Sequence, residues 1–131
     1  MQWNDGAYAG FSASEPWIGV NPNYPAINVE QALADPDSVL HYYRQLIRLR
    51  KEHPVLVYGR YEYFEDTPDD VFVFQRILDG TTLLVLGNFS AQEQQTRIPT
   101  AGNGGEYRLL LGNYPGHELN DQGPTTLRAS T

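Results

Sequence analysis

The sequence is poor in cysteine, in basic residues and in long hydrophobic runs. Its 131 residues include no cysteine, and nine lysines and arginines stand against sixteen acidic residues, which gives a formal net charge of -7. Without cysteine the chain has no disulfide, thiolate metal site or cysteine nucleophile, which fits a reducing compartment. We therefore expect a cytoplasmic protein.

The scarcity of basic side chains also restricts the partners. Proteins that bind nucleic acid or an anionic membrane surface neutralise phosphates with lysine and arginine. No apolar run approaches the length that spans a bilayer, and no basic segment followed by an apolar one marks a secretory signal. The sequence predicts no nucleic-acid partner and no membrane partner.

What the sequence does contain predicts a folded domain with two unlike halves. Its hydrophobic content is 40%, with nine Tyr, five Phe and two Trp. Residues 1–25 alternate aromatics with turn residues, which indicates an ordered loop region. Asn28 and Gln31 then form a capping-box pattern, in which Gln31 reaches back, and predict a short helix to about Ala34.

A second helix is predicted over residues 38–52. Its apolar positions follow a three- and four-residue spacing but form an arc wider than one modest neighbour would cover, at Val39, Leu40, Tyr42, Tyr43, Leu46, Ile47 and Leu49. Proline at position 54 stops the helix. The breadth of the arc predicts that this helix is covered on two sides.

The second half has the alternating pattern of strands. Runs rich in β-branched and aromatic residues predict strands at 55–64, 71–78, 81–89, 94–98 and 107–112. Asp79-Gly80 is a strong hairpin signal, and turns are expected at 67–70 and 101–105. The predicted fold class is mainly β: an antiparallel Greek-key-type β domain preceded by an N-terminal loop region and one or two helices.

No complete active site is visible. The neighbouring carboxylates Glu65-Asp66 and Asp69-Asp70 fall in a turn, where two carboxyl groups cannot face each other across a cleft as glycosidases require. The histidines His41, His53 and His117 lack the spacing of metal ligands, and no GxSxG, GxGxxG or GxxxxGK pattern occurs. We expect no catalytic residue, no metal and no cofactor.

Aromatic side chains are the remaining candidates for a binding site. Tyr61 and Tyr63 share one face of a predicted strand because strand faces alternate with period two. Exposed rings can stack on sugars, whereas buried rings belong to a core, which is the commoner fate. Tyr61, Tyr63 and Tyr114 are therefore candidate carbohydrate contacts, and a core role stays open for each.

Several segments together resemble the C-terminal part of α-glucosidases of glycoside hydrolase family 13, nearest to oligo-1,6-glucosidase and trehalose-6-phosphate hydrolase. The matching stretches are MQWNDG (1–6), AGF (9–11), PWI (16–18), VNPNY (20–24), INVE (27–30), DS (37–38), YRQLIRLRK (43–51) and PVLVYG (54–59). The likeness thins over the second half, where LVLGNFS (84–90) still fits.

The resemblance implies that residues 1–54 are the terminal loops and last helix of a (β/α)8 catalytic barrel and that residues 55–131 are its C-terminal β domain. Family members cleave α-glucosidic bonds with retention, using an aspartate nucleophile, a glutamate acid/base and a third aspartate, none of which maps onto this chain. An arginine that usually precedes the MQW motif is also missing. The resemblance therefore implies a non-catalytic chain that stabilises the barrel of an oligosaccharide-cleaving parent enzyme.

Two other roles stay open. The chain could be a carbohydrate-binding module that works through the three tyrosines, or an interaction module that forms a homodimer through an exposed helix face or sheet edge. The second possibility arises because the family's β domains usually close with a further strand, and the residues from 126 onward do not show that pattern. An omitted strand would leave a bare sheet edge, which invites pairing with another copy.

Overall fold

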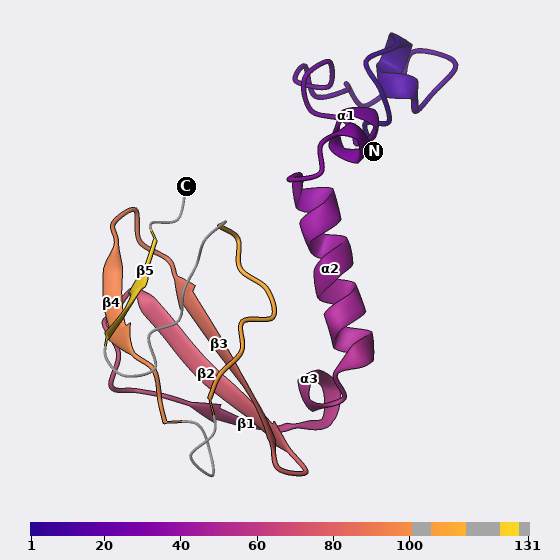
Figure 1. Ribbon diagram of the computed structural model, residues 1–131. Coiled ribbons are helices and arrows are strands. Elements are labelled where there is room, and N and C mark those ends of the chain that lie inside the picture. The colour runs from indigo at the N-terminus through magenta and orange to yellow at the C-terminus, as the bar shows by residue number, and fades with distance from the viewer. Residues whose placement is uncertain (101–105, 115–123, 129–131) are drawn as a thin grey trace. The chain divides into compact units, whose positions relative to one another are not determined.

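The computed structural model describes residues 1–100, 106–114 and 124–128, which form two compact units, Met1–Leu49 and Arg50–Thr131 (Figure 1). The first unit consists of loops and helices, and the second contains the strands. The predicted fold class, mainly antiparallel β after an N-terminal region of loops and helices, is confirmed.

The first residues of the chain fold against the start of a helix. The backbone amides of Val29 and Glu30 donate to the carbonyls of Gln2 and Trp3, at 3.0 and 2.9 Å. Those amides belong to the first turn of α1 (Val29–Ala34), where no partner exists within the helix. The opening segment is thus ordered by hydrogen bonds that the helix terminus needs.

A short turn, η1 (Ala7–Gly10), holds this segment in shape. Tyr8 and Ala9 adopt left-handed backbone angles, with φ of 52° and 57°, which are uncommon for residues with a side chain. The carbonyl of Ala9 accepts from the amides of Trp3 and Asn4, and the Ala9 side chain is fully buried. These contacts offset a backbone strain of about 1–2 kcal/mol per residue.

Of the two capping contacts predicted for α1, one is present and the other is not. The Asn28 side chain accepts from the amide of Gln31 at 2.9 Å, as expected of an N-cap. The Gln31 side chain, however, donates to the carbonyl of Pro25 at 2.7 Å instead of reaching back to Asn28. The preceding Pro25 turn brings that carbonyl within reach, so Gln31 ties the loop to the helix.

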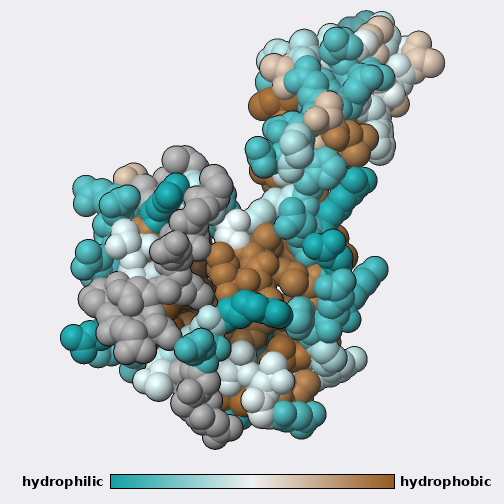
Figure 2. Space-filling model, in the orientation of Figure 1, coloured by the Kyte–Doolittle hydropathy of each residue, from teal (hydrophilic) through white to brown (hydrophobic). Residues whose placement is uncertain are grey.

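The long helix, α2 (Val39–Glu52), begins one residue later than predicted and has no buried residue. Its apolar stripe is open, with Val39 81% and Tyr43 63% exposed, and Leu46 and Ile47 are also exposed. Figure 2 shows hydrophobic surface in brown on both halves of the chain. Within its own unit no position of the apolar arc is buried, and Leu40, Tyr42 and Leu49 are half-buried.

The predicted strand 55–64 is wrong in its first part. Residues 55–58 form a helical turn, α3 (Val55–Tyr58), and the strand β1 (Arg60–Tyr63) begins only after Gly59. Strand propensity is overridden here because the Arg76 side chain donates to the carbonyls of Val55, Val57 and Gly59, at 3.2, 3.3 and 2.8 Å. This single guanidinium fastens α3 to the sheet.

The hairpin is confirmed. Strands β2 (Val71–Leu78) and β3 (Thr81–Asn88) pair antiparallel in a register that runs from Val71 opposite Asn88 to Leu78 opposite Thr81. Asp79 and Gly80 both have positive φ, 46° and 77°, as a two-residue turn of this kind requires. β1 adds to the other edge of β2, which gives the order β1-β2-β3.

A second, two-stranded sheet contains a strand that the sequence analysis missed. β4 (Gln94–Arg97) pairs with β5 (Pro124–Leu127), whereas residues 107–112, predicted as a strand, are not in one. The turn expected at 101–105 lies outside the described residues. The Asn88 side chain joins the two sheets, because its amide nitrogen donates to the carbonyls of Leu127 and Arg128.

The core of the second unit lies on one face of the three-stranded sheet. Val71 and Val73 of β2 are buried together with Leu127 of β5, and partly buried apolar side chains surround them, namely Phe64, Leu84 and Leu86. The buried threonines Thr96 and Thr125 face each other across the β4–β5 pair. The small sheet thus supplies Leu127 to the core.

Tyr107 gives a first prediction, because its hydroxyl is buried without a hydrogen-bond partner among the described residues. Burial also raises the pKa of this tyrosine. Replacing Tyr107 with phenylalanine removes a polar group that lost water and gained no partner among the described residues, so we expect the free energy of unfolding to rise by about 1 kcal/mol. Urea unfolding would measure the free energy, with Tyr61→Phe at an exposed site as a neutral control. If Tyr107→Phe is less stable than the original protein, the hydroxyl of Tyr107 is not unpaired.

Candidate functional site

The four carboxylates around the predicted turn at 67–70 do not form a glycosidase pair. Glu65, Asp66, Asp69 and Asp70 are exposed and surround a turn in which the amide of Val71 donates to the carbonyl of Pro68, as predicted. Carboxyl groups on such a turn face solvent, not each other across a cleft. That this chain contributes no catalytic carboxylate stays a prediction, and these four side chains are consistent with it.

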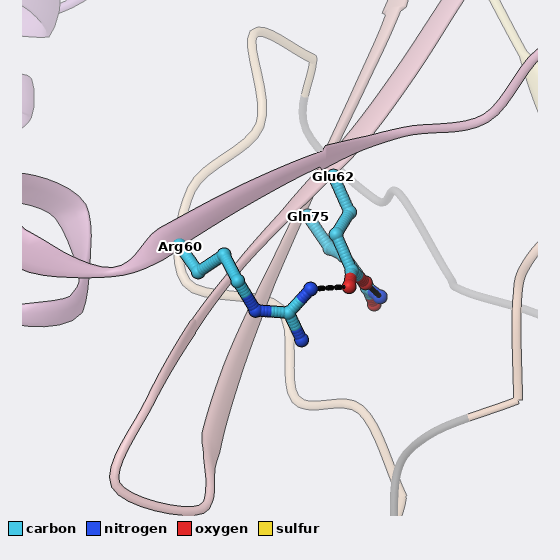
Figure 3. Close-up of polar contacts among 3 residues, drawn as sticks. All are labelled: Arg60, Glu62 and Gln75. Carbon is cyan, nitrogen blue, oxygen red and sulfur yellow. Dashed lines mark hydrogen bonds and ion pairs between the residues drawn. The ribbon is translucent and has the colours of Figure 1, made fainter.

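Glu62 is held by two neighbouring side chains, Arg60 and Gln75 (Figure 3). Its two oxygens accept from Gln75 on the neighbouring strand and from the guanidinium of Arg60 on its own strand. The hydrogen bond from Gln75, followed by that from Arg60, lowers the pKa of Glu62 below its ordinary value of 4.5. A general acid needs a raised pKa, so Glu62 is suited to a structural role.

The lowered pKa of Glu62 predicts a pH dependence of stability. The ionised carboxylate is favoured in the folded state, so its contribution is complete above pH 4.5 and is lost as the pH falls through the lower, folded-state pKa. We expect a small destabilisation in Glu62→Gln at neutral pH that shrinks as the pH drops below 4.5. Thermal unfolding of both proteins along a pH series would measure the difference, and a gap that widens in acid would contradict it.

The histidines do not form a metal site in the part of the chain that the structure describes. His41 lies on α2, with its Nε2 3.1 Å from the carbonyl of Leu33, and His53 follows the helix. No group of three histidine, cysteine or acidic side chains within the described ranges is arranged to hold a metal ion. His117 lies outside these ranges.

The structure brings two of the three candidate tyrosines together. Tyr61 and Tyr63 lie on the same face of β1, at 48% and 46% exposure, and contact the rings of Phe74 and Phe72 at centroid distances of 5.2 Å each. Phe72 and Phe74 contact each other at 5.5 Å. Tyr61 and Tyr63 thus belong to a row of four rings that spans two strands.

The third candidate, Tyr114, lies beside a basic side chain. It is half-buried, and the guanidinium carbon of Arg128 lies 5.7 Å from the centre of its ring, a cation–π arrangement. A carbohydrate contact at any of the three tyrosines stays a prediction.

Phe72 and Phe74 were missed as site candidates. The signal was present, because the Asp79-Gly80 turn fixes the register of the hairpin and the even positions of β2 then share one face. What the sequence did not contain was the pairing of β1 with β2, which places Tyr63 opposite Phe74.

The sequence is similar to those of known enzymes. Residues 1–59 match the family model described as the catalytic domain of alpha amylase. The chain is 42% identical over 128 residues to the oligo-1,6-glucosidase of Parageobacillus thermoglucosidasius, an alignment that covers 98% of this chain and 23% of the relative. It is 43% identical over 114 residues to the trehalose-6-phosphate hydrolase of Escherichia coli, which covers 87% and 20%.

The fold of this chain also matches parts of solved structures. The fold matches trehalose-6-phosphate hydrolase from Bacillus licheniformis with a TM-score of 0.86 and 32% identity, and trehalulose synthase MutB from Pseudomonas mesoacidophila MX-45 with a TM-score of 0.81 and 32% identity. Each match covers 98% of this chain and 23% of the solved chain. The chain thus spans about a fifth of the length of the relatives it matches.

These matches place the likeness among proteins of the alpha-amylase type. Within this type, the resemblance to the C-terminal segment of family 13 α-glucosidases of the oligo-1,6-glucosidase and trehalose-6-phosphate hydrolase kind is confirmed. In the part of the chain that the structure describes, no helix has the length and apolar character needed to cross a membrane.

Proposed function

We propose that this chain forms the non-catalytic C-terminal part of an α-glucosidase. Residues 1–54 complete the catalytic barrel, and residues 55–131 form the β domain that stabilises it. The whole protein hydrolyses α-glucosidic bonds of oligosaccharides with retention of configuration, by means of carboxylates that lie elsewhere in it.

The observation that carries this proposal is the exposure of α2. A 14-residue amphipathic helix normally buries its apolar stripe, because tertiary packing and not propensity supplies most of its stability. Here none of its residues is buried, and the stripe containing Val39 and Tyr43 is open. The matches to residues 1–59 and to a fifth of the relatives' length support a catalytic barrel as the missing neighbour.

The proposal is tested first on the chain alone. With a chromogenic α-glucoside at high protein concentration, we expect a rate equal to the buffer blank, with the oligo-1,6-glucosidase of Parageobacillus thermoglucosidasius as the positive control. Turnover above the blank that co-purifies with the chain would contradict a non-catalytic role.

A chimera tests the stabilising role. In it, this chain replaces the matching 23% of the Parageobacillus enzyme. We expect the chimera to hydrolyse the α-glucoside, and we expect Tyr43→Asp on the apolar stripe of α2 to inactivate it at a lower temperature. Arg44→Asp, at an exposed position outside the stripe, should change that temperature less. An inactive chimera, or equal effects of the two substitutions, would contradict the proposal.

A further inference from the structure

The basic side chains of the first unit are gathered in one place. Residues 1–49 contain two arginines, one histidine and no lysine. Arg44, Arg48 and His41 all line the same open pocket, which has a volume of about 540 Å³. The acidic residues of this unit do not line it, namely Asp5, Glu15, Glu30, Asp35 and Asp37. In a chain with a net charge of -7, this local excess of positive charge favours an anionic ligand.

The pocket lies on the polar face of α2. His41, Arg44, Gln45 and Arg48 recur at spacings of three and four residues, so their side chains share one face of the helix. Arg48 follows Val39 by nine residues, which is two and a half turns at about 3.6 residues per turn, so these two side chains point to opposite sides. A neighbour that packs on the apolar stripe around Val39 therefore does not fill the pocket.

The other wall of the pocket is the end of α1, and it is fixed in place by hydrogen bonds. The Ser38 hydroxyl donates to the carbonyl of Ala32 at 2.6 Å, and Nε2 of His41 donates to the carbonyl of Leu33 at 3.1 Å. Carbonyls in the last turn of a helix carry partial negative charge and repel an anion when they are free. Because these two carbonyls already accept hydrogen bonds, the wall is both ordered and tolerant of an anion.

The two arginines suit a phosphate group better than a carboxylate. Arg44 and Arg48 are both exposed and lie one helical turn apart, where like charges repel each other unless an anion lies between them. Within the part of the chain that the structure describes, the Arg44 guanidinium has no hydrogen bond and no ion pair. One guanidinium fork engages both oxygens of a carboxylate, whereas the three terminal oxygens of a phosphate ester can accept from two forks at once.

The rest of the lining is uncharged and suits an organic group. Leu33, Ala34 and Pro36 provide apolar surface beside the cations, and Gln45 provides an amide that both donates and accepts. The volume of the pocket exceeds what a phosphate group needs and lies within the range of small-molecule sites, about 300–1,000 Å³. The pocket therefore has room for the uncharged part of an ester.

We propose that this pocket binds a phosphate group carried by a small organic ester. Arg44 and Arg48 hold the phosphate oxygens, and the uncharged part of the ester lies against Leu33 and Pro36. This inference goes beyond the proposed function and does not depend on it, because it uses only contacts within the first unit.

Isothermal titration calorimetry on the whole chain tests the proposal. Phenyl phosphate, inorganic phosphate and phenol are titrated at low salt, where charge interactions are least screened. We expect saturable binding of phenyl phosphate, weaker binding of inorganic phosphate and no binding of phenol.

Substitutions then assign the binding to the pocket. Arg44→Gln and, as a second variant, Arg48→Gln should each raise the Kd for phenyl phosphate about tenfold or more, because each removes charge-assisted hydrogen bonds. Arg50→Gln is the matched control, since it removes the same charge from an exposed position of α2 two residues away from Arg48, and it should change the Kd less than about twofold. Glutamine forms helices nearly as well as arginine, and circular dichroism of each variant checks that the helices are kept.

The outcomes distinguish the possible ligands. Tighter binding of phenyl phosphate than of inorganic phosphate supports an ester, and equal binding of the two keeps the phosphate site but assigns it to free phosphate. The proposal is overturned if neither compound binds saturably up to about 10 mM, both in the isolated chain and in the chimera described above. Equal losses in Arg44→Gln and Arg50→Gln also overturn it, because they show an effect of net charge alone. None of these results bears on the proposed function, which is measured by hydrolysis of the α-glucoside.

Discussion

Replacing Arg76 with methionine is expected to lower the free energy of unfolding of the β region by about 2–4 kcal/mol. The half-buried guanidinium donates to three carbonyls, those of Val55, Val57 and Gly59. Methionine keeps the apolar stem of the side chain and removes only the donors, so α3 loses its fastening to the sheet.

Urea unfolding followed by near-ultraviolet circular dichroism would measure this loss, since the four-ring row reports on the sheet. Arg97→Met is the matched control, because Arg97 is exposed on β4 and its substitution should change the free energy by less than about 0.5 kcal/mol. Equal effects of the two substitutions would show that the Arg76 hydrogen bonds do not hold α3.

Replacing Gly59 with alanine is expected to cost about 1–3 kcal/mol through overpacking. Gly59 is buried between α3 and β2, and a Cβ there would lie 2.4 Å from the carbonyl oxygen of Val55 and 3.2 Å from the Cβ of Arg76. The Val55 oxygen is backbone and already accepts from the Gly59 amide, so it cannot move without opening α3.

The control is Gly87→Ala on the same sheet. The atoms nearest to a Cβ at Gly87 belong to the ring of Phe89, at 3.2 Å, and the exposed Phe89 side chain can rotate away. Thermal unfolding should therefore show a distinctly larger decrease for Gly59→Ala. If Gly87→Ala is the more harmful substitution, the close approach of α3 to the sheet is not what requires glycine at position 59.

The elements that were predicted well carry their signal locally. Asp79-Gly80 needs positive φ at both positions, which few residue pairs tolerate, and this fixed both the turn and the strands on either side of it. Asn28 marked the start of α1 because its side chain satisfies an amide three residues away. Neither signal depends on a distant part of the chain.

The elements that were predicted wrongly depend on distant partners. The segment VLVY at 55–58 has strand propensity but forms α3, since Arg76 gathers its carbonyls from about twenty residues away. The segment PTTL at 124–127 has little propensity of its own and becomes β5 because β4 pairs with it and Leu127 enters the core. Residues 107–112 have the propensity and are not a strand.

The candidate site shows the same contrast between local signals and contacts with distant parts of the chain. Period-two alternation placed Tyr61 and Tyr63 on one face of a strand, and the pattern of the opening segments established the resemblance to family 13 α-glucosidases. Neither could say whether that face is buried, since alternation is the same for a core face and an open one. Only the tertiary structure decided it: the β4–β5 pair contributes Leu127 to the opposite face, whereas Tyr61 and Tyr63 stay 48% and 46% exposed, because a sheet buries the face on which another layer packs.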